Sequence, residues 1–450
     1  MLYFIEGGDA VKKRIVYAAV LVLAALLFTG CSMMTVDQMY RLPKHSESYN
    51  NLQSAIDSAM QGLSYSAPLT GENQQNVQLA DLDGDGEEEY ILFAKSGEEK
   101  PLRILVFRIT NRQCHLVTTV ACNGSAFDVV EYADMDGKPG MEMVVGRRLS
   151  DQLVRSVSVY TMQDNDIVQM VSVNYTKLLT VDLDGNHQSE LMVIRPGTEE
   201  GGVGVVELYA VKNSAMERYN EVSMSQPADK LKRVILGNLE GGYPAVFTAS
   251  TVDDTAIITD IYTVVDGMLT NVAVSNESGT SIQTMRNFYV YADDLNNDGV
   301  VELPSLINMK PLEGKLSEDR HHLIRWYAMT QDGDEVNKLH TFHNFVGGWY
   351  VQLNSRWAER VSVETYGNQY TFHLWNESYK QTQKLFTVTA LTGQNREEHA
   401  LADGGFVLHR TESVLYTASL EPAAEDLGLT QDHLIFSFRL IQQDWKTGET

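Results

Sequence analysis

Five segments of this sequence repeat a short acidic pattern whose residue types and spacing suit metal binding. The most complete segment reads Asp81-Leu-Asp83-Gly-Asp85-Gly-Glu-Glu-Glu89, so oxygen donors stand at positions 1, 3, 5 and 9. Position 7 can add its backbone carbonyl. Calcium takes about six to eight hard oxygen ligands in a forgiving geometry, whereas magnesium demands stricter octahedral geometry. The pattern therefore favours calcium.

The segments start at intervals of 53, 48, 56 and 56 residues, and we number them loop 1 (residues 81–89), loop 2 (134–142), loop 3 (182–190), loop 4 (238–243) and loop 5 (294–302). Loops 3 and 5 keep a donor at all four positions. Loop 2 has Lys138 and Pro139 at positions 5 and 6, and loop 4 is shortened, which disfavours metal in both. Because Asp, Asn and Gly also favour ordinary turns, an acidic turn without an ion is the alternative for every loop.

An EF-hand shares the first half of this pattern, but it requires a glutamate at position 12 and flanking helices. Position 12 is Leu92 in loop 1 and Ser305 in loop 5, and the flanking residues favour strands. The EF-hand interpretation is therefore excluded, as is a dockerin-like pair of calcium-binding helices. Gly86 and Gly299 at position 6 permit a sharp turn, whereas His187 at that position of loop 3 predicts strain or an altered turn.

The residues between the loops predict the sheets that position them. Apolar runs follow loop 1 at 90–94, 102–109, 115–121 and 127–133, and matching runs follow loop 2 at 143–146, 157–162, 167–173 and 177–181. The runs are rich in Val, Ile, Tyr, Phe and Thr, which favour strands. Four short strands per repeat of about 50 residues are typical of a propeller blade. We predict a mainly β fold, a β-propeller of about five or more four-stranded blades; an elongated array of sandwich domains is the alternative.

The acidic loops, the apolar strand after each and the blade-length period resemble the FG-GAP and VCBS repeats of integrin-alpha-type propellers, over about residues 73–350. The family pattern usually ends in Asp, where this sequence has Glu. The resemblance implies structural calcium bound by Asp81, Asp83, Asp85 and Glu89 in loop 1, by Asp182, Asp184, Asn186 and Glu190 in loop 3, and by Asp294, Asn296, Asp298 and Glu302 in loop 5.

The N-terminus has the features of a secretory signal. Three basic residues at 12–14 precede an apolar run over 15–28, which ends in Thr29-Gly30-Cys31. A spanning helix needs about 20 apolar residues, so this run is short for a membrane span. The end of the run resembles the bacterial lipobox, which implies that residues 1–30 are removed and that Cys31 is lipidated. A retained anchor helix with a chance cysteine is the alternative.

The remaining sequence divides into a tether, a propeller and a C-terminal domain. Polar residues 31–48 suit a tether, and helical spacing of apolar residues predicts a helix over 48–61. We assign 49–355 to the propeller with this leading helix and 356–450 to a separate α+β domain. In the ambiguous stretch 430–441, we favour a helix capped by Thr430 over a strand.

Composition limits the possible functions. The chain carries 35 basic and 60 acidic residues among 450, a net charge of −25, which argues against nucleic-acid binding. Three cysteines exclude a disulfide scaffold, and we expect Cys114 and Cys122 to be buried free thiols. His340 and His343 lie in a predicted strand, where this spacing points them to opposite faces and away from a shared metal.

We therefore expect a membrane-anchored, extracytoplasmic binding or scaffold lipoprotein whose propeller is stabilised by calcium. The membrane is the partner implied by the lipid anchor, and a protein or glycan ligand would be its further partner. The sequence contains no recognisable catalytic constellation. An extracytoplasmic enzyme acting on polysaccharide or cell-envelope material is the alternative.

Overall fold

The computed structural model describes residues 47–149, 154–199, 201–212, 215–253, 256–287, 290–309, 312, 321–376, 381–400 and 405–442. The predicted signal peptide (1–30), Cys31 and nearly all of the tether lie outside the described residues. Among the described helices, none has the length and apolar character required to cross a bilayer.

Contacts divide the chain into two units. The first includes helix α3 (Glu47–Ala59) and the hairpin tip at residues 109–115, and the second contains 62–108 and 116–450. Helix α3 confirms the leading helix predicted over 48–61, and its apolar Ile56 is buried. Within this unit, the Asn51 side-chain amide donates to the Arg112 carbonyl at 2.9 Å.

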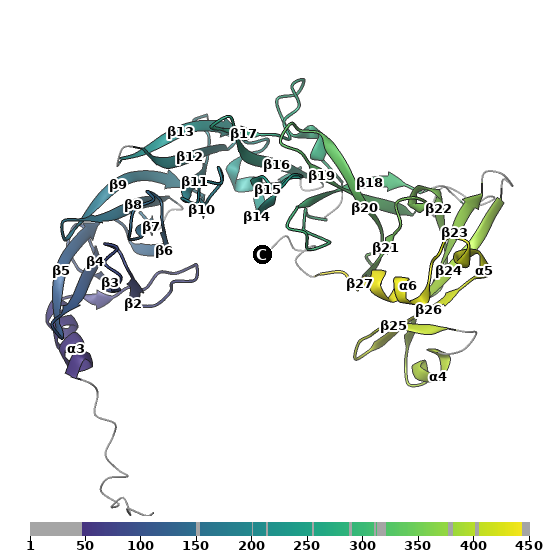
Figure 1. Ribbon diagram of the computed structural model, residues 1–450, viewed down its shortest axis with the longest axis horizontal. Coiled ribbons are helices and arrows are strands. Elements are labelled where there is room, and N and C mark those ends of the chain that lie inside the picture. Colours follow the sequence, from purple (N-terminus) through teal and green to yellow (C-terminus); the bar gives the residue numbers. More distant parts are fainter. Residues whose placement is uncertain are drawn as a thin grey trace, which may run out of the picture. The chain divides into compact units, whose positions relative to one another are not determined.

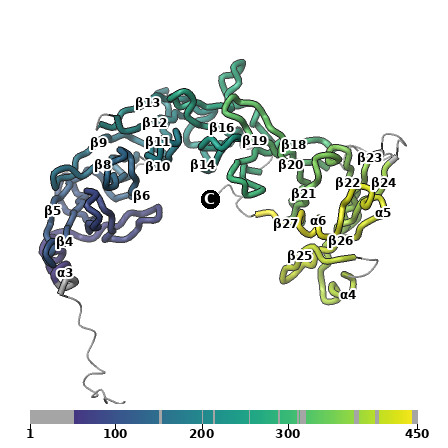
Figure 2. Tube along the Cα trace, viewed as in Figure 1, coloured from purple at the N-terminus to yellow at the C-terminus, as the bar shows by residue number. Residues whose placement is uncertain are grey.

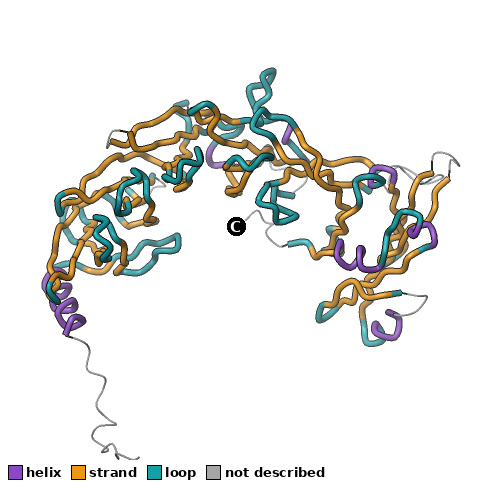
Figure 3. The backbone as a smooth tube through the Cα atoms, viewed as in Figure 1, coloured by secondary structure: helices purple, strands orange, loops and turns teal. Residues whose placement is uncertain are grey.

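The second unit consists of antiparallel sheets, and strands dominate it while helices are few and short (Figure 3). In the described part of the chain, six sheets follow one another in sequence (Figure 1). The first contains β1 (Ser64–Tyr65), β2 (Val77–Ala80), β3 (Glu89–Lys95), β4 (Leu102–Thr110) and β5 (Gln113–Cys122). The second contains β6 (Ala126–Ala133), β7 (Glu142–Arg148), β8 (Arg155–Gln163) and β9 (Asp166–Tyr175).

The third sheet contains β10 (Lys177–Val181), β11 (Glu190–Arg195), β12 (Val205–Lys212) and β13 (Ala215–Ser223), and the fourth contains β14 (Leu231–Asn238), β15 (Pro244–Val252), β16 (Ala256–Val265) and β17 (Met268–Asn271). The 3-10 helices Ala228–Lys230 and Ile282–Thr284 flank the fourth sheet in sequence. Each of these sheets is a simple meander in chain order.

The fifth sheet contains β18 (Glu302–Asn308), β19 (His322–Met329), β20 (Glu335–Asn344), β21 (Trp349–Leu353) and, from the end of the described chain, β27 (Phe438–Leu440). The sixth contains β22 (Val361–Tyr366), β23 (Gln369–Asn376), β24 (Gln381–Thr392), β26 (Val414–Leu420) and β25 (Phe406–Arg410). The yellow β27 lies beside the green β21 in the chain trace (Figure 2), where Val351 pairs with Phe438.

Among the described C-terminal residues, the short helices are the 3-10 helix Ala358–Arg360, α4 (Arg396–Ala400), α5 (Pro422–Glu425) and α6 (Gln431–Ser437). The Thr430 hydroxyl accepts the His433 amide, so the helix favoured for 430–441 is confirmed for its first part, while its last part is β27. The predicted boundary at 355–356 lies between β21 and the 3-10 helix, and one hydrophobic core contains residues from both sides of it, such as Trp349 and Phe372.

Successive sheets share apolar cores. One cluster joins Phe93 of the first sheet to Phe127 of the second, whose rings lie 5.0 Å apart, and equivalent clusters join each later sheet to the next. The middle strands are buried on both faces; Ile91 to Ala94 are all 0% exposed. The outer strands β5 and β9 alternate between exposed and partly buried side chains. This burial explains why the middle strands are continuously apolar in sequence.

The strand pairings correct the predicted grouping of the repeats. The sequence analysis grouped the run before each acidic loop with the preceding repeat, but β6 pairs with β7, across loop 2, and β10 pairs with β11, across loop 3. A short loop between two strands favours a hairpin, so the strands on both sides of it join one sheet. Each sheet therefore begins one strand earlier than the sequence grouping implied.

Candidate metal-binding loops

Loop 1 connects β2 to β3, loops 2 to 4 each connect the first two strands of a sheet, and loop 5 leads into β18. Before loop 5 the first strand is reduced to one bridge, between Asp293 and Glu302. Position 2 anchors loops 1 to 4 because its apolar side chain is buried in every case: Leu82, Met135, Leu183 and Leu239. The flanking strands confirm that these are not EF-hands.

The position-1 carboxylate organises the turn in loops 1 and 3. Asp81 Oδ1 accepts the Gly84 amide at 2.7 Å, and Oδ2 accepts the Gly86 amide at 3.0 Å. In loop 3 the same amides, at positions 4 and 6, donate to Asp182 at 2.8 and 2.9 Å. His187 holds a positive φ of 69° at position 6, so of the two predicted outcomes, strain or an altered turn, the structure shows backbone strain in an unaltered turn. Both loops therefore adopt the same turn.

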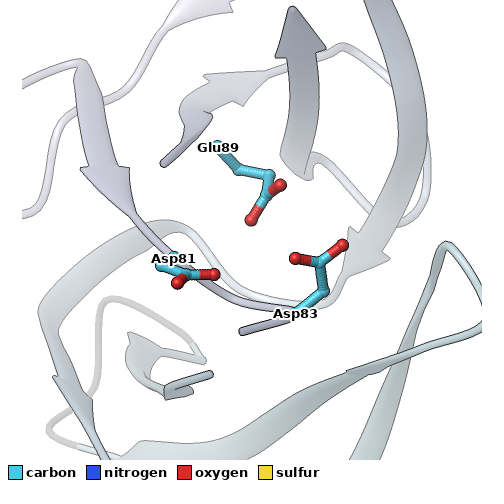
Figure 4. A group of neighbouring side chains, drawn as sticks. All are labelled: Asp81, Asp83 and Glu89. Carbon is cyan, nitrogen blue, oxygen red and sulfur yellow. The ribbon is translucent and has the colours of Figure 1, made fainter. Parts of the chain in front are cut away.

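The position-9 glutamate begins the strand after loops 1, 2, 3 and 5 and is almost fully buried in each. One of its carboxylate oxygens accepts the backbone amide of position 2, at 2.9 Å from Leu82, 2.9 Å from Met135, 2.8 Å from Leu183 and 3.0 Å from Leu295. The side chain therefore turns back toward its own loop. Figure 4 shows Glu89 facing Asp81 and Asp83 across loop 1.

Carboxylate oxygens converge in three loops. Atoms within 4.8 Å of one another come from Asp81, Asp83 and Glu89 in loop 1, from Asp134, Asp136 and Glu142 in loop 2, and from Asp182, Asp184 and Glu190 in loop 3. Positions 1, 3 and 9 thus meet as predicted. Asp85 at position 5 of loop 1 lies outside its group, and both Asp85 and Asn186 accept the amide of position 7 in their own turn.

Loop 5 gathers its residues through hydrogen bonds. The Asn296 side-chain amide donates to Asp298 at 3.0 Å and to Glu302 at 3.2 Å, while Asp294 accepts the Gly299 amide at 2.8 Å. With an amide at position 3, loop 5 has three carboxylates among its four predicted ligands, the same number as loop 3 and one fewer than loop 1. The predicted residues of loop 5 are therefore adjacent.

The glutamates are poorly stabilised as anions in loops 3 and 5. Burial, followed by the charges of Asp184 and Asp182, raises the pKa of Glu190 to about 7. Burial, with the charges of Asp298 and Asp294, likewise raises the pKa of Glu302 to about 7. A cation bound at either loop would stabilise these carboxylates, because an adjacent opposite charge favours the ionised form.

Arg108 on β4 supplies such a cation to loop 1, and the sequence analysis did not identify it. Its Nε donates to Glu89 Oε1 at 2.8 Å, and its Nη2 donates to Asp83. Burial opposes the charge of Arg108, but the hydrogen bond and the charges of Glu89 and Asp83 raise its pKa. The guanidinium therefore lies between two of the predicted metal ligands.

Lysines approach three other loops. The Lys138 amine of loop 2 lies 2.5 Å from Asp136, and in the same loop the Thr161 hydroxyl donates to Glu142 at 3.0 Å. Lys338 on β20 lies 2.6 Å from Glu240 in loop 4 and 3.8 Å from Asp298 in loop 5. The basic residue at loop 2 supports the sequence argument against a metal there.

Loop 3 differs in this respect. In the described part of the chain, no lysine or arginine pairs with its carboxylates. The His187 ring lies 3.9 Å from Asp182 but is almost fully exposed. The donors of loop 3 are carboxylate and amide oxygens, which suit a hard cation such as calcium better than zinc. Its donor set and charge therefore fit the predicted ion.

Neighbouring loops are joined by one recurring hydrogen bond. The position-8 amide donates to the position-1 carbonyl of the preceding loop: Met141 to Asp81 at 2.9 Å, Ser189 to Asp134 at 2.7 Å and Val301 to Asn238 at 3.0 Å. Between loops 3 and 4, the residue at the donor position is Pro244, which pairs with Asn238. Proline has no amide hydrogen, so it cannot donate this hydrogen bond to loop 3. An interaction that orders the backbone of one loop therefore also restricts the backbone of the neighbouring loop.

The two histidines and two cysteines singled out in the sequence lie within the strands of the sheets. His340 and His343 lie on β20, and the His343 ring stacks on Tyr350 with centroids 4.9 Å apart. Cys114 and Cys122 are free as expected, but Cys114 is only partly buried because it lies near the start of the outer strand β5.

No protein-family model and no curated protein matches the sequence. Among solved structures, the chain is similar to the exotype rhamnogalacturonan lyase YesX, with 10% identity and a TM-score of 0.25 over 72% of this chain and 65% of that chain. It is also similar to the rhamnogalacturonan lyase PL11 of Bacillus licheniformis, with 11% identity and a TM-score of 0.30 over 72% of this chain and 80% of that chain.

Proposed function

We propose that this chain is a membrane-anchored, extracytoplasmic binding or scaffold lipoprotein, and that its sheets are blades of a calcium-stabilised propeller of the FG-GAP and VCBS type. The recurring loop carries the proposal: in three successive sheets, a buried glutamate closes an oxygen-lined hairpin between two neighbouring strands of the same sheet. Calcium at such a loop would bind residues of two adjacent strands together.

Calcium has a structural role in this proposal. Asp182, Asp184 and Glu190 of loop 3 would hold the ion most strongly, because their charge is uncompensated by protein. Loop 5 is the second candidate, with Lys338 beside Asp298. The ion would neutralise the buried glutamate and, through the Ser189 hydrogen bond to Asp134, would stabilise the preceding loop as well.

The anchor is tested by replacing Cys31 with Ser in the full-length protein and separating membranes from soluble material. The expected result is that wild type stays with the membrane and carries a lipid on Cys31 by mass spectrometry, while Cys31→Ser is released or remains an uncleaved precursor. Cys114→Ser is the matched control and should behave as wild type. Unlipidated wild-type protein that retains residues 1–30 would contradict the lipoprotein assignment.

The calcium role is tested by melting the purified full-length protein in calcium and in chelator. A ligand that binds only the native state stabilises it by about 2.7 kcal/mol at a hundredfold excess over Kd. Chelation should therefore lower the Tm. Equal Tm values, together with no bound calcium after dialysis, would overturn the structural-calcium proposal. Polysaccharide cleavage by the same preparation would support the enzyme alternative over the scaffold.

A further inference from the structure

Loops 1 and 3 differ at the position that faces the buried glutamate from the next strand. Tyr90 pairs with Phe107, so the following step along the ladder places Glu89 opposite Arg108. Leu191 pairs with Tyr209, so the same step places Glu190 opposite Ala210. The equivalent residues are Thr161 facing Glu142 in loop 2 and Ala328 facing Glu302 in loop 5.

We propose that this facing position decides how loops 1 and 3 are neutralised, and that Arg108 is a built-in counter-ion that takes the place of the divalent cation in loop 1. Ala210 leaves the equivalent oxygens of loop 3 open to calcium. The inference rests on the proposed calcium role and deepens it, because it assigns the ion to particular loops.

The contacts of Arg108 match those that a cation in the loop would make. Its guanidinium donates to Asp83 and Glu89, which are positions 3 and 9, the same positions that converge in loop 3. Arginine keeps its charge at all relevant pH values and presents several N–H groups in a planar fork. It can therefore satisfy two carboxylates at once without an ion.

Arg108 is itself held in place from the second sheet. Its Nη1 donates to the Asn165 side chain at 2.9 Å, in the turn between β8 and β9, where Asn165 has a positive φ of 64°. The same guanidinium lies 3.9 Å from the Met162 sulfur. The side chain thus links loop 1 to the second sheet, and this link would persist when calcium is absent.

Ala210 provides the opposite situation. It is 7% exposed on β12, its methyl group offers no charge, and the Glu190 that it faces is almost fully buried. A single substitution in each loop should therefore exchange their behaviour: Arg108→Ala should open loop 1 to calcium, and Ala210→Arg should close loop 3.

The test measures bound calcium per molecule in full-length wild type, Arg108→Ala, Ala210→Arg and the double variant. Arg108→Ala should gain one ion, and its Tm should fall in chelator but recover in calcium. Ala210→Arg should lose one ion and most of its response to chelator. The double variant should match the wild-type ion count. Arg103→Ala, on the same strand but bonded to Glu98, is the matched control and should change no ion count.

The two proposals fail in different ways. A wild type that binds no calcium contradicts the proposed role of loop 3. An Arg108→Ala protein that gains no ion contradicts the counter-ion inference, whatever the wild type binds. Arg108→Gln provides a second, less disruptive variant, and it should also gain calcium affinity. If both Arg108 variants fold with the wild-type ion count, the inference is overturned.

Discussion

Loops 1 and 3 fold into the same turn but are neutralised differently. In both, the position-1 aspartate accepts amides from positions 4 and 6, and a buried glutamate accepts the position-2 amide. Loop 1 then receives the Arg108 guanidinium, which opposes the rise that burial causes in the pKa of Glu89, whereas Glu190 in loop 3 has no such partner among the described residues and its pKa is raised to about 7. The turn is thus a property of the loop sequence, while the charge balance depends on a residue from another strand.

This difference changes how stability responds to calcium. The junction between the first two sheets is fastened by protein atoms alone, through Arg108 and the Met141 hydrogen bond to Asp81. The third sheet depends on an external ion in our account. In a chain with both kinds of interaction, the first two sheets would stay joined at low calcium, while the third sheet would be stabilised only when calcium is present.

The largest expected effect comes from neutralising the buried glutamate in each loop. Glu89→Gln should cost about 2–3 kcal/mol in calcium and in chelator alike, because it removes a charged hydrogen bond from Arg108. Glu190→Gln should cost about 2–3 kcal/mol in calcium at a hundredfold excess over Kd, because ion binding is lost. In chelator it should be neutral or stabilising, because a buried charge is removed. Denaturant unfolding under both conditions measures all four values.

The two variants control for each other, since each makes the same chemical change at the same loop position. If Glu190→Gln destabilised the protein equally with and without calcium, loop 3 would be a purely structural turn. If Glu89→Gln became harmful only in calcium, loop 1 would bind an ion despite Arg108.

A smaller effect is expected from adding a carboxylate to loop 5. Adding it at a donor position or at a neighbouring position distinguishes the effect of donor geometry on calcium affinity from the effect of charge alone. Asn296→Asp restores the carboxylate found at position 3 of loops 1 and 3. Ligand charge tunes calcium affinity, so the variant should bind its ion about tenfold more tightly. Calorimetric titration measures the change, and Asn297→Asp, at the adjacent position 4, is the control that adds the same charge outside the donor positions. An equal gain in both variants would show that only overall charge matters.

The smallest expected effect concerns the backbone of loop 3. His187 holds φ at 69°, whereas Gly86 at the same position of loop 1 holds 89°. Left-handed backbone costs a residue with a Cβ about 1–2 kcal/mol, part of which glycine loses again through its greater freedom when unfolded. His187→Gly should therefore stabilise the protein by about 0.5–1 kcal/mol with an unchanged calcium count. Destabilisation, or loss of the ion, would mean that the His187 side chain contributes to the site.

Much of the fold follows from local patterns in the sequence. Strands such as β8 and β9 were predicted because both their apolar composition and the turn residues between them are local signals. The grouping of strands into sheets was shifted by one strand, because periodicity alone does not tell which neighbour a strand pairs with. The last described strand, β27, pairs with β21 far back along the chain, and no local signal marks such a return.

The candidate site was predictable only within each loop. Positions 1, 3 and 9 converge as the spacing implied, since a short hairpin brings them together. Arg108 lies 19 residues after Glu89, on a neighbouring strand. The equivalent residues that face the glutamate are Arg108, Thr161, Ala210 and Ala328. Their equivalence follows from the strand pairings, which the sequence pattern alone does not give.

The central claim is tested most directly by anomalous diffraction from crystals of the full-length protein grown with calcium or a lanthanide. Our account predicts a peak in loop 3, about 2.3–2.6 Å from oxygens of Asp182, Asp184 and Glu190 when the ion is calcium, and no peak in loop 1, where Arg108 contacts Asp83 and Glu89. A peak in loop 1 with Arg108 displaced, or an empty loop 3 at saturating calcium, would contradict it.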